Sequence, residues 1–405
     1  MATSGLKKIS LVMVSNLIAN GVTFLILMVA ASALPVDRFA SFSLAVSLGF
    51  MLTTLLDFGV NVTAVRSFGM EKNKLVLDGM MSAKWLTLAV AALPSVASLY
   101  FSPGPGSYYS IIANGVIGAA VLNLWMGCRT LEQANESFAS YARSNILYAT
   151  IRLLAGGIVL WLSKDAQYLY LASFVLPGLL FALAQGVWGR AYELSWAGVR
   201  QTFRQAKNYS IWVFVSSAAY GAVLYSPQFF IAKQFGPVEV SSYGIALSFM
   251  GIVTLIANSI RTVLLPRMMK AGATETVGSI NVLLSRLIRF FPAFLGGAAL
   301  ILIAGWFVID FWYARTLPDA AWVFVACSAG LLGTVYVGFF NIGIHSLGMP
   351  NTEAINNIGR LLLLIGSLYL FGKSAIAVAV VFAVVLLLGE LWTAAIVFMR
   401  TRSEE

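Results

Sequence analysis

The sequence predicts an all-α polytopic membrane protein with twelve transmembrane helices, arranged in two six-helix bundles related by an internal repeat. The first reason is composition: of 405 residues, 60% are hydrophobic and only 10% are charged, whereas about 25% of the residues in a soluble domain are charged. The second reason is a series of long apolar runs separated by short polar loops. The third is a similarity between the two halves of the chain.

Twelve apolar runs are each long enough to cross a bilayer, which takes about 20 residues. They are Ile9–Leu34, Phe39–Val62, Gly79–Phe101, Tyr108–Met126, Ser144–Leu162, Tyr168–Trp188, Tyr209–Phe230, Ser241–Leu264, Leu287–Ile309, Ala320–Ile344, Ile355–Phe371 and Ile376–Phe398. The loops between them are too short to hold a domain outside the membrane. We therefore expect an N-terminal bundle over 1–190, a cytoplasmic linker over 191–208 and a C-terminal bundle over 209–405.

The two halves share a motif at the loop between their first two spans. Pro35-Val36-Asp37 in the first half recurs as Pro237-Val238-Glu239 in the second, and the apolar helix starts that follow are also similar. Internal duplication of this kind is typical of secondary transporters, whose substrate site lies between the repeats.

The distribution of lysine and arginine predicts the orientation of the spans. With a cytoplasmic N-terminus, the outer loops hold only five of the 26 basic residues, namely Arg38, Lys164, Lys233, Arg315 and Lys373. Cytoplasmic loops carry the excess of basic residues in membrane proteins. We therefore expect both termini and the linker to lie on the cytoplasmic side.

Several function classes are excluded by the residues that the chain lacks. Two cysteines and one histidine, His345, leave no ligand set for a multi-histidine or cysteine-rich metal site. There is no nucleotide-binding loop and no nucleophile elbow. The net charge of +10 follows the membrane topology and does not indicate nucleic acid. We expect no metal, no cofactor, no catalytic residue and no enzymatic activity.

Arg152 is a charge near the middle of the apolar run Ser144–Leu162. A charge at the bilayer centre costs a few kcal/mol on insertion scales, so such residues usually face an interior cavity or a partner. Arg152 is therefore a candidate ligand for an anionic head group such as pyrophosphate. The alternative is a structural ion pair with Glu390, which also stands near a midplane. Glu390 is itself a candidate coupling residue, as a proton site.

Polar residues at helical spacing predict a central cavity. These residues are Thr53, Asp57 and Asn61 in span two, Thr254, Asn258 and Arg261 in span eight, Asn16, Asn20 and Thr23 in span one, and Ser216 and Tyr220 in span seven. A spacing of i and i+4, continued to i+7 or i+8 in the three larger sets, places each set on one helical face. Lys84 and Arg261 stand about one turn inside the cytoplasmic membrane face and could attract an anion. For any single residue, the alternative is interhelical hydrogen bonding.

Short motifs carry a resemblance to a known family. The loop segments Ala33–Phe39 and Phe235–Tyr243 resemble a leucine-glycine-proline pattern followed by acidic and small residues. Leu56–Val60 resembles a leucine-aspartate-leucine-glycine stretch, and Leu347–Asn351 resembles a leucine-glycine-x-proline loop. On these motifs the chain is similar to the flippases for lipid-linked oligosaccharides in the multidrug/oligosaccharidyl-lipid/polysaccharide exporter superfamily.

The resemblance implies a flippase that moves polyprenyl-pyrophosphate-linked oligosaccharide repeat units across the bacterial inner membrane by alternating access. The product would serve the synthesis of lipopolysaccharide O-antigen or exopolysaccharide. Partners would be the lipid-linked oligosaccharide and membrane lipids, with polysaccharide polymerase and chain-length proteins as further candidates. One rival is a cation-coupled multidrug exporter of the same superfamily, whose cavity should be acidic. The other is a membrane enzyme of polysaccharide assembly, which would need a large outer loop.

Overall fold

The computed structural model describes residues 2–71, 73–101, 107–188, 191–206, 210–251, 272–337 and 350–403, and these residues form helices and turns without any strand. By packing, the chain divides into two compact units, Met1–Tyr225 and Ser226–Glu405. The division falls within a helix of the second predicted bundle. The bundle boundaries expected at 190 and 209 describe the repeat rather than the packing, and they stay a prediction.

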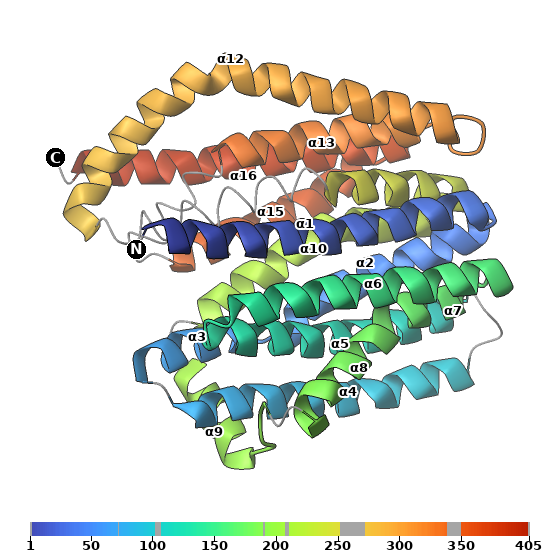
Figure 1. Cartoon of the computed structure of the whole chain (residues 1–405). Helices are drawn as coiled ribbons and strands as arrows, with labels where there is room; N and C mark the ends of the chain where they lie inside the picture. The colour runs from blue at the N-terminus through green and yellow to red at the C-terminus, as the bar shows by residue number, and fades with distance from the viewer. Residues whose placement is uncertain are drawn as a thin grey trace. The chain divides into compact units, whose positions relative to one another are not determined.

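The first unit is built from helices that run along the chain in the order of Figure 1. They are α1 (Ala2–Ala33), α2 (Val36–Leu56), α3 (Val60–Glu71), α4 (Lys74–Tyr100), α5 (Tyr108–Ala134), α6 (Phe138–Leu162), α7 (Ala166–Tyr170), the π-helix η1 (Leu171–Val175), α8 (Leu176–Leu183), the π-helix η2 (Ala184–Trp188), α9 (Trp196–Ala206) and α10 (Ser210–Gln234). The most extensive packing joins α2 with α5, α4 with α5, and α1 with α6.

The second unit contains the end of α10 and four further long helices. They are α12 (Gly272–Tyr313), α13 (Ala320–Val337), α15 (Pro350–Phe371) and α16 (Ala375–Ser403). A helical segment over 237–251 follows α10. Within this unit α13 packs against both α16 and α12, and α15 packs against α16.

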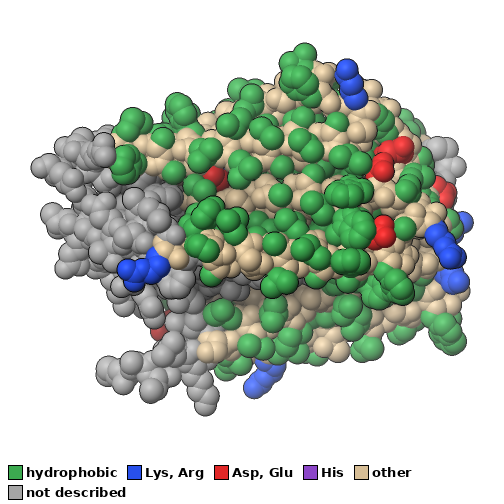
Figure 2. Space-filling view, turned by 90° about the horizontal axis from the view of Figure 1, so that it is seen from above, with side chains coloured by type: hydrophobic (Ala, Val, Ile, Leu, Met, Phe, Trp, Pro, Cys, Tyr) green, Lys and Arg blue, Asp and Glu red, His purple; other side chains and the backbone are tan. Residues whose placement is uncertain are grey.

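Ten helices among the described residues are long and apolar enough to cross a membrane. They coincide with the predicted spans one to six and nine to twelve. Helix α10 occupies the predicted seventh span, and the predicted eighth span, Ser241–Leu264, is described only as far as residue 251. Figure 2 shows that the visible described surface is mostly apolar, with few charged side chains. Such a surface fits lipid, because apolar side chains need no water there.

A group of aromatic residues lies in the core of the first unit, to which α3, α4, α5, α6 and α8 contribute buried side chains. Trp125 and Tyr148 are 2% and 3% exposed, and their rings stack with centroids 4.2 Å apart at 14°. Phe181 packs against the same pair. A stacked aromatic pair contributes about 0.5–1.5 kcal/mol beyond the area that it buries. This core holds α5 and α6 in a fixed register, which matters below because both helices carry pocket residues.

The second predicted span is interrupted, and this corrects the sequence analysis. Helix α2 ends at Leu56 and α3 begins at Val60. Between them Phe58 and Gly59 take positive φ angles of 49° and 69°, a conformation that glycine adopts without strain. The expectation that Thr53, Asp57 and Asn61 share one face of a continuous helix is therefore wrong for Asn61, because the turn at Phe58 and Gly59 reorients the chain after Asp57.

The predicted linker contains a helix that packs tightly on the first unit. Helix α9 crosses α4 where Gly198 meets Gly79, and a Cβ atom at either position would overlap the backbone of the other helix. The Thr202 hydroxyl donates a hydrogen bond to the carbonyl of Val76 at 3.2 Å. Most of the segment 191–206 therefore belongs to the first unit as a packed element.

Candidate functional site

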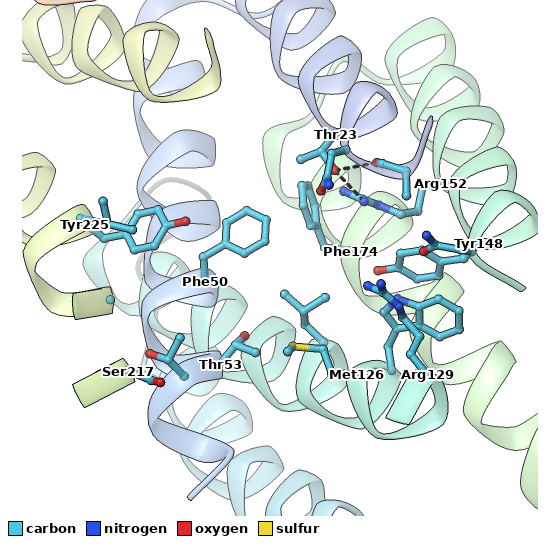
Figure 3. A pocket seen from close by; sticks show the side chains of 18 of the residues that line it. Thr23, Phe50, Thr53, Met126, Arg129, Tyr148, Arg152, Phe174, Ser217 and Tyr225 are labelled. Atoms are coloured by element: carbon cyan, nitrogen blue, oxygen red, sulfur yellow. Dashed lines mark hydrogen bonds between the residues drawn. The ribbon is translucent and has the colours of Figure 1, made fainter. Parts of the chain in front are cut away.

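A pocket of about 470 Å³ opens within the first unit, in the volume range of small-molecule sites. Figure 3 shows its two sides, with Arg129, Tyr148, Arg152 and Phe174 facing Phe50, Thr53, Ser217 and Tyr225. The lining residues come from α1, α2, α5, α6, η1 and the first half of α10. They include two arginines and no acidic residue. The pocket is therefore a cationic, partly aromatic cavity.

Arg152 lies on α6 and is 5% exposed. Its Nε donates to the carbonyl of Ser173 at 2.7 Å, and its Nη1 donates to the Thr23 hydroxyl at 2.8 Å. The guanidinium also lies over the rings of Phe174 and Tyr148, at 4.5 and 5.3 Å from their centroids. Its Nη2 is buried without a hydrogen-bond partner. One arm of the fork is therefore uncommitted beside the pocket.

The Ser173 carbonyl, in the π-helix η1, is available to Arg152 because its i+4 residue is Pro177, which has no backbone N–H to donate. A π-helical segment shifts the backbone hydrogen bonds from i−4 to i−5, and such segments are frequent at functional sites. Phe174, the next residue of η1, also lines the pocket. The irregular backbone of span six thus positions both the acceptor and one of the rings that hold Arg152.

Arg129 supplies the second positive charge from α5. Its Nη2 donates to Asn16 Oδ1 at 2.8 Å, and its guanidinium lies 4.7 Å from the ring centroid of Tyr141. Asn16 Oδ1 also accepts from Asn145 Nδ2 at 2.9 Å. Arg129 Nε, Asn145 Oδ1 and the Tyr148 hydroxyl are buried without a hydrogen-bond partner. A polar ligand would satisfy these groups, since buried polar atoms are normally paired.

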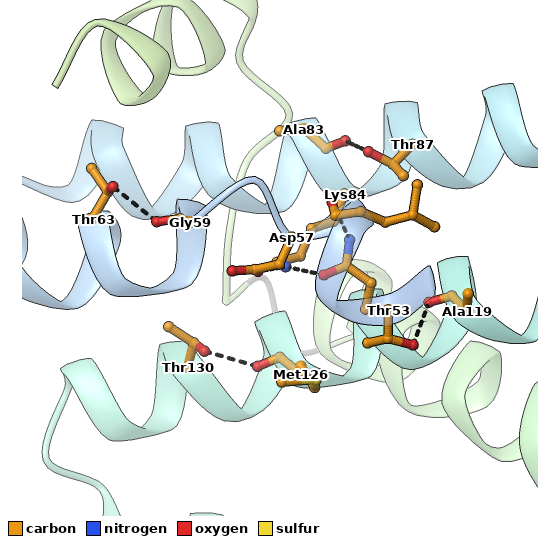
Figure 4. A network of polar contacts seen from close by, with 12 residues as sticks. Thr53, Asp57, Gly59, Thr63, Ala83, Lys84, Thr87, Ala119, Met126 and Thr130 are labelled. Carbon is orange, nitrogen blue, oxygen red and sulfur yellow. Dashed lines mark hydrogen bonds and ion pairs between the residues drawn. The ribbon is translucent and has the colours of Figure 1, made fainter. Parts of the chain in front are cut away.

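A buried ion pair braces the interruption of span two (Figure 4). The Lys84 ammonium lies 2.9 Å from Asp57 Oδ1 and donates to Asn123 Oδ1 at 2.5 Å. Asn123 Nδ2 in turn donates to the carbonyl of Leu56, at the end of α2, at 2.9 Å. The side chain of Lys84 is 2% exposed and that of Asp57 is 18% exposed. Neither lines the pocket, so this cluster stabilises the turn.

The second unit has its own buried ion pair between α15 and α16. Arg360 Nη2 lies 3.1 Å from Glu390 Oε1, and both side chains are 3% exposed. Beside it, Asn356 Nδ2 donates to the Gly389 carbonyl at 3.0 Å and to the Thr393 hydroxyl at 2.6 Å. Glu390 therefore pairs with Arg360, which replaces the alternative in which it pairs with Arg152.

Comparison with known proteins identifies the family. Residues 6–271 match the model of a family described as polysaccharide biosynthesis protein. The chain belongs to this family. A search of curated proteins found no match to this chain.

Solved structures confirm the fold of this family member. An inward-facing multidrug resistance MATE family transporter of the MOP superfamily is 14% identical, with a TM-score of 0.74 over 96% of this chain and 95% of that one. A Vibrio cholerae MATE transporter, VcmN, in mutant form, is 13% identical, with a TM-score of 0.67 over 100% and 98%. The lipid II flippase MurJ, inward closed, is 14% identical, with a TM-score of 0.65 over 95% and 86%. The fold is that of a twelve-span transporter with an internal repeat, as expected from the sequence.

The structure places the site residues predicted for this family member in several different surroundings. Arg152, Asn20 and Tyr220 line the pocket. Asn16 lies behind the pocket wall, where it orients Arg129. Lys84 and Asp57 lie together away from the lining. Asn258 and Arg261, with the rest of the second stripe, lie outside the described residues. The cavity expected between the two stripes stays a prediction.

From the sequence, Arg129 counted only among the basic residues that lie outside the outer loops, and neither Tyr148 nor Trp125 was singled out. A signal was present, because Trp125 and Arg129 on α5 and Tyr148 and Arg152 on α6 are both aromatic–arginine pairs at i, i+4. Side chains at this spacing are neighbours on a helix surface. Two such pairs on helices that pack together indicate a shared cationic surface.

Proposed function

We propose that this family member is a flippase for polyprenyl-pyrophosphate-linked oligosaccharide repeat units, acting by transport and not as an enzyme. The observation that carries the proposal is the pocket in the first unit, which has two arginines and no acidic lining residue. A diphosphate bears negative charge that would be expensive to bring into a membrane protein without such partners. The free Nη2 of Arg152 is a donor of the kind that phosphate oxygens accept.

The pocket also suggests where each part of the substrate would lie. The diphosphate would bind between Arg129 and Arg152, and the first sugar would lie toward the aromatic and hydroxyl side chains of α2 and α10. These are Phe50, Thr53, Thr54, Ser217, Tyr220 and Tyr225. The polyprenyl tail would stay in the lipid, because apolar chains gain nothing from entering a polar cavity. Alternating access between the two repeats would then expose the head group to the other side.

A transport assay tests this function directly. The purified protein in proteoliposomes should move a fluorescent lipid-linked oligosaccharide between leaflets, and the Arg152→Gln variant should lose most of that activity. Empty liposomes serve as the control, and both proteins are reconstituted at equal protein content. Transport of organic cations without transport of the lipid-linked sugar would instead favour a multidrug exporter.

We further propose that the protein lies in a bacterial inner membrane with both termini in the cytoplasm, and that it serves O-antigen or exopolysaccharide synthesis. The proposal is supported by the excess of basic residues on that side of the spans. With Cys128 and Cys327 replaced, single cysteines at Gly106 and at the exposed Arg200 should react with an impermeant reagent from opposite faces. Reaction of both from one face would reject this orientation.

A further inference from the structure

A buried carboxylate lies one turn from the pocket and takes no part in the site described above. Glu132, near the end of α5, is 9% exposed. Its Oε1 accepts three hydrogen bonds, from the hydroxyls of Ser140 at 2.9 Å and Ser144 at 2.7 Å on α6 and from Gln185 Nε2 at 3.1 Å. Its Oε2 is buried without a hydrogen-bond partner. All the donors therefore converge on one oxygen and leave the other bare.

The amide of Gln185 has the matching defect. Gln185 lies in the π-helix η2, and its Oε1 is a second buried acceptor without a donor. A carboxylic acid and a primary amide can exchange two hydrogen bonds, N–H to acid oxygen and O–H to amide oxygen. Here the first of these bonds is present, and the second requires a hydrogen on Glu132 Oε2. A single proton would therefore satisfy both orphaned oxygens at once.

The charges around Glu132 make this proton consequential for the pocket. Arg129 stands one helical turn earlier on α5 and interacts electrostatically with Glu132, without a direct ion pair between these two described side chains. Cys128 is the other titratable group near it on α5. The side chains that contact Glu132 from α6 and η2 are Ser140, Ser144 and Gln185, none of which is ionisable.

We propose that Glu132 is a proton-binding site linked through Arg129 to the anion pocket. The proton binds to Oε2 and donates to Gln185 Oε1. It removes the negative charge that offsets Arg129, so the pocket attracts an anion more strongly. Linkage is reciprocal, so a bound anion also strengthens proton binding. The link to the pocket rests on the proposed function, whereas the proton site itself rests only on the geometry of Glu132 and Gln185.

A binding titration against pH tests the link. The probe is a short-chain prenyl diphospho-sugar, a diphosphate diester whose own charge is constant over the range used, about pH 5 to pH 8. The affinity of the unmodified protein should rise as pH falls, by roughly 5- to 100-fold, the usual range for coupled sites. The Glu132→Gln variant keeps the shape of the carboxyl group but removes its charge. Its affinity for the probe should therefore be high at every pH. The matched control Glu136→Gln, which removes an exposed carboxylate in the turn just after the same helix, should titrate like the unmodified protein.

Infrared difference spectroscopy tests the proton without any ligand. Acidification should produce a protonated-carboxyl C=O band that is absent in Glu132→Gln and shifted in Gln185→Ala, which removes the hydrogen-bond acceptor. A band that persists in Glu132→Gln would overturn the proton site.

Equal pH dependence of binding in Glu132→Gln and the unmodified protein would overturn the link. Binding that depends on Na⁺ at Glu132 would replace the proton by a metal cation and so reject the proposal. Failure of the probe to bind at any pH would reject the anion pocket of the proposed function, while the infrared result would still decide the proton site.

Discussion

Arg152 should contribute more to anion binding than any exposed cation of the chain, and Arg152→Gln measures that contribution. Two of its nitrogens are committed to Ser173 and Thr23, while Nη2 has no partner. A diphosphate oxygen that accepts from Nη2 gains a charge-assisted hydrogen bond. Hydrogen bonds to charged groups contribute about 1.5–3 kcal/mol, which corresponds to a loss of roughly 10- to 100-fold in affinity in the variant.

The assay compares the dissociation constant of the prenyl diphospho-sugar for three variants in the same detergent. Arg152→Lys keeps the charge but lacks the planar fork and cannot hold Ser173, Thr23 and the ligand together, so its affinity should be intermediate. Arg143→Gln removes an exposed arginine from the same helix and should leave the affinity unchanged. It controls for the loss of one positive charge at long range, which salt screens.

A folded Arg152→Gln variant that bound the probe as tightly as the unmodified protein would rule out this role of Arg152. Arg152 would then be a structural residue that joins α6 to α1 and η1. Equal losses in Arg152→Gln and Arg143→Gln would point instead to a diffuse effect of net charge, and the pocket would not be the binding site.

The two buried ion pairs should matter for stability, and each can be tested by SDS-induced unfolding. Asp57→Ala leaves the Lys84 ammonium buried and unpaired, and such a loss costs about 3–5 kcal/mol of unfolding free energy. We expect the lower end because Asp57 is 18% exposed. Adding Lys84→Met should recover most of this stability, and no recovery would show that the unpaired charge is not the cause. Glu390→Ala should behave in the same way in the second unit, with Arg360→Met as the compensating change. Gly389→Ala should also destabilise this unit, by roughly 1–3 kcal/mol, because its Cβ would overlap the Arg360 side chain; an unfolding curve like that of the unmodified protein would contradict this packing.

Apolar length predicted most of the fold, because bilayer thickness fixes the length of a span. The run Ile9–Leu34 became α1, and Ala320–Ile344 became α13 as far as it is described. The interruption of span two could not be predicted in this way. Leu56–Val60 is apolar apart from Asp57, and only Gly59 marked a turn. The turn is stable because Asn123, far along the chain, hydrogen-bonds to the carbonyl of Leu56.

The position of Arg152 could be predicted, but its surroundings could not. A charge within an apolar run is visible in the sequence, and the cost of burial implies a partner. The partner turned out to be a hydroxyl, a backbone carbonyl and two rings rather than Glu390. The free carbonyl did have a signal in the sequence, because Pro177, four residues after Ser173, has no N–H to donate to it. Arg129 could not be predicted as a site residue. A cation near the end of a span is normally explained by the excess of basic residues on the cytoplasmic side, and only its contact with Asn16 places it at the pocket.

Irregular backbone in the first unit coincides with the polar side chains that carry the proposals. Backbone groups that leave the regular pattern within a membrane must find partners inside the protein. The turn after α2 finds Asn123 and, through it, Lys84. The π-helix η1 gives its Ser173 carbonyl to Arg152, and η2 brings Gln185 onto Glu132. In the first two cases a side chain satisfies an exposed carbonyl, and in the third the π-helix carries a side chain that contacts a buried carboxylate. Arg152, Glu132 and Gln185 each retain a buried polar atom without a hydrogen-bond partner. These side chains can therefore respond to a ligand or a proton, whereas the described side chains of the Asn123 cluster are paired with one another and with the end of α2.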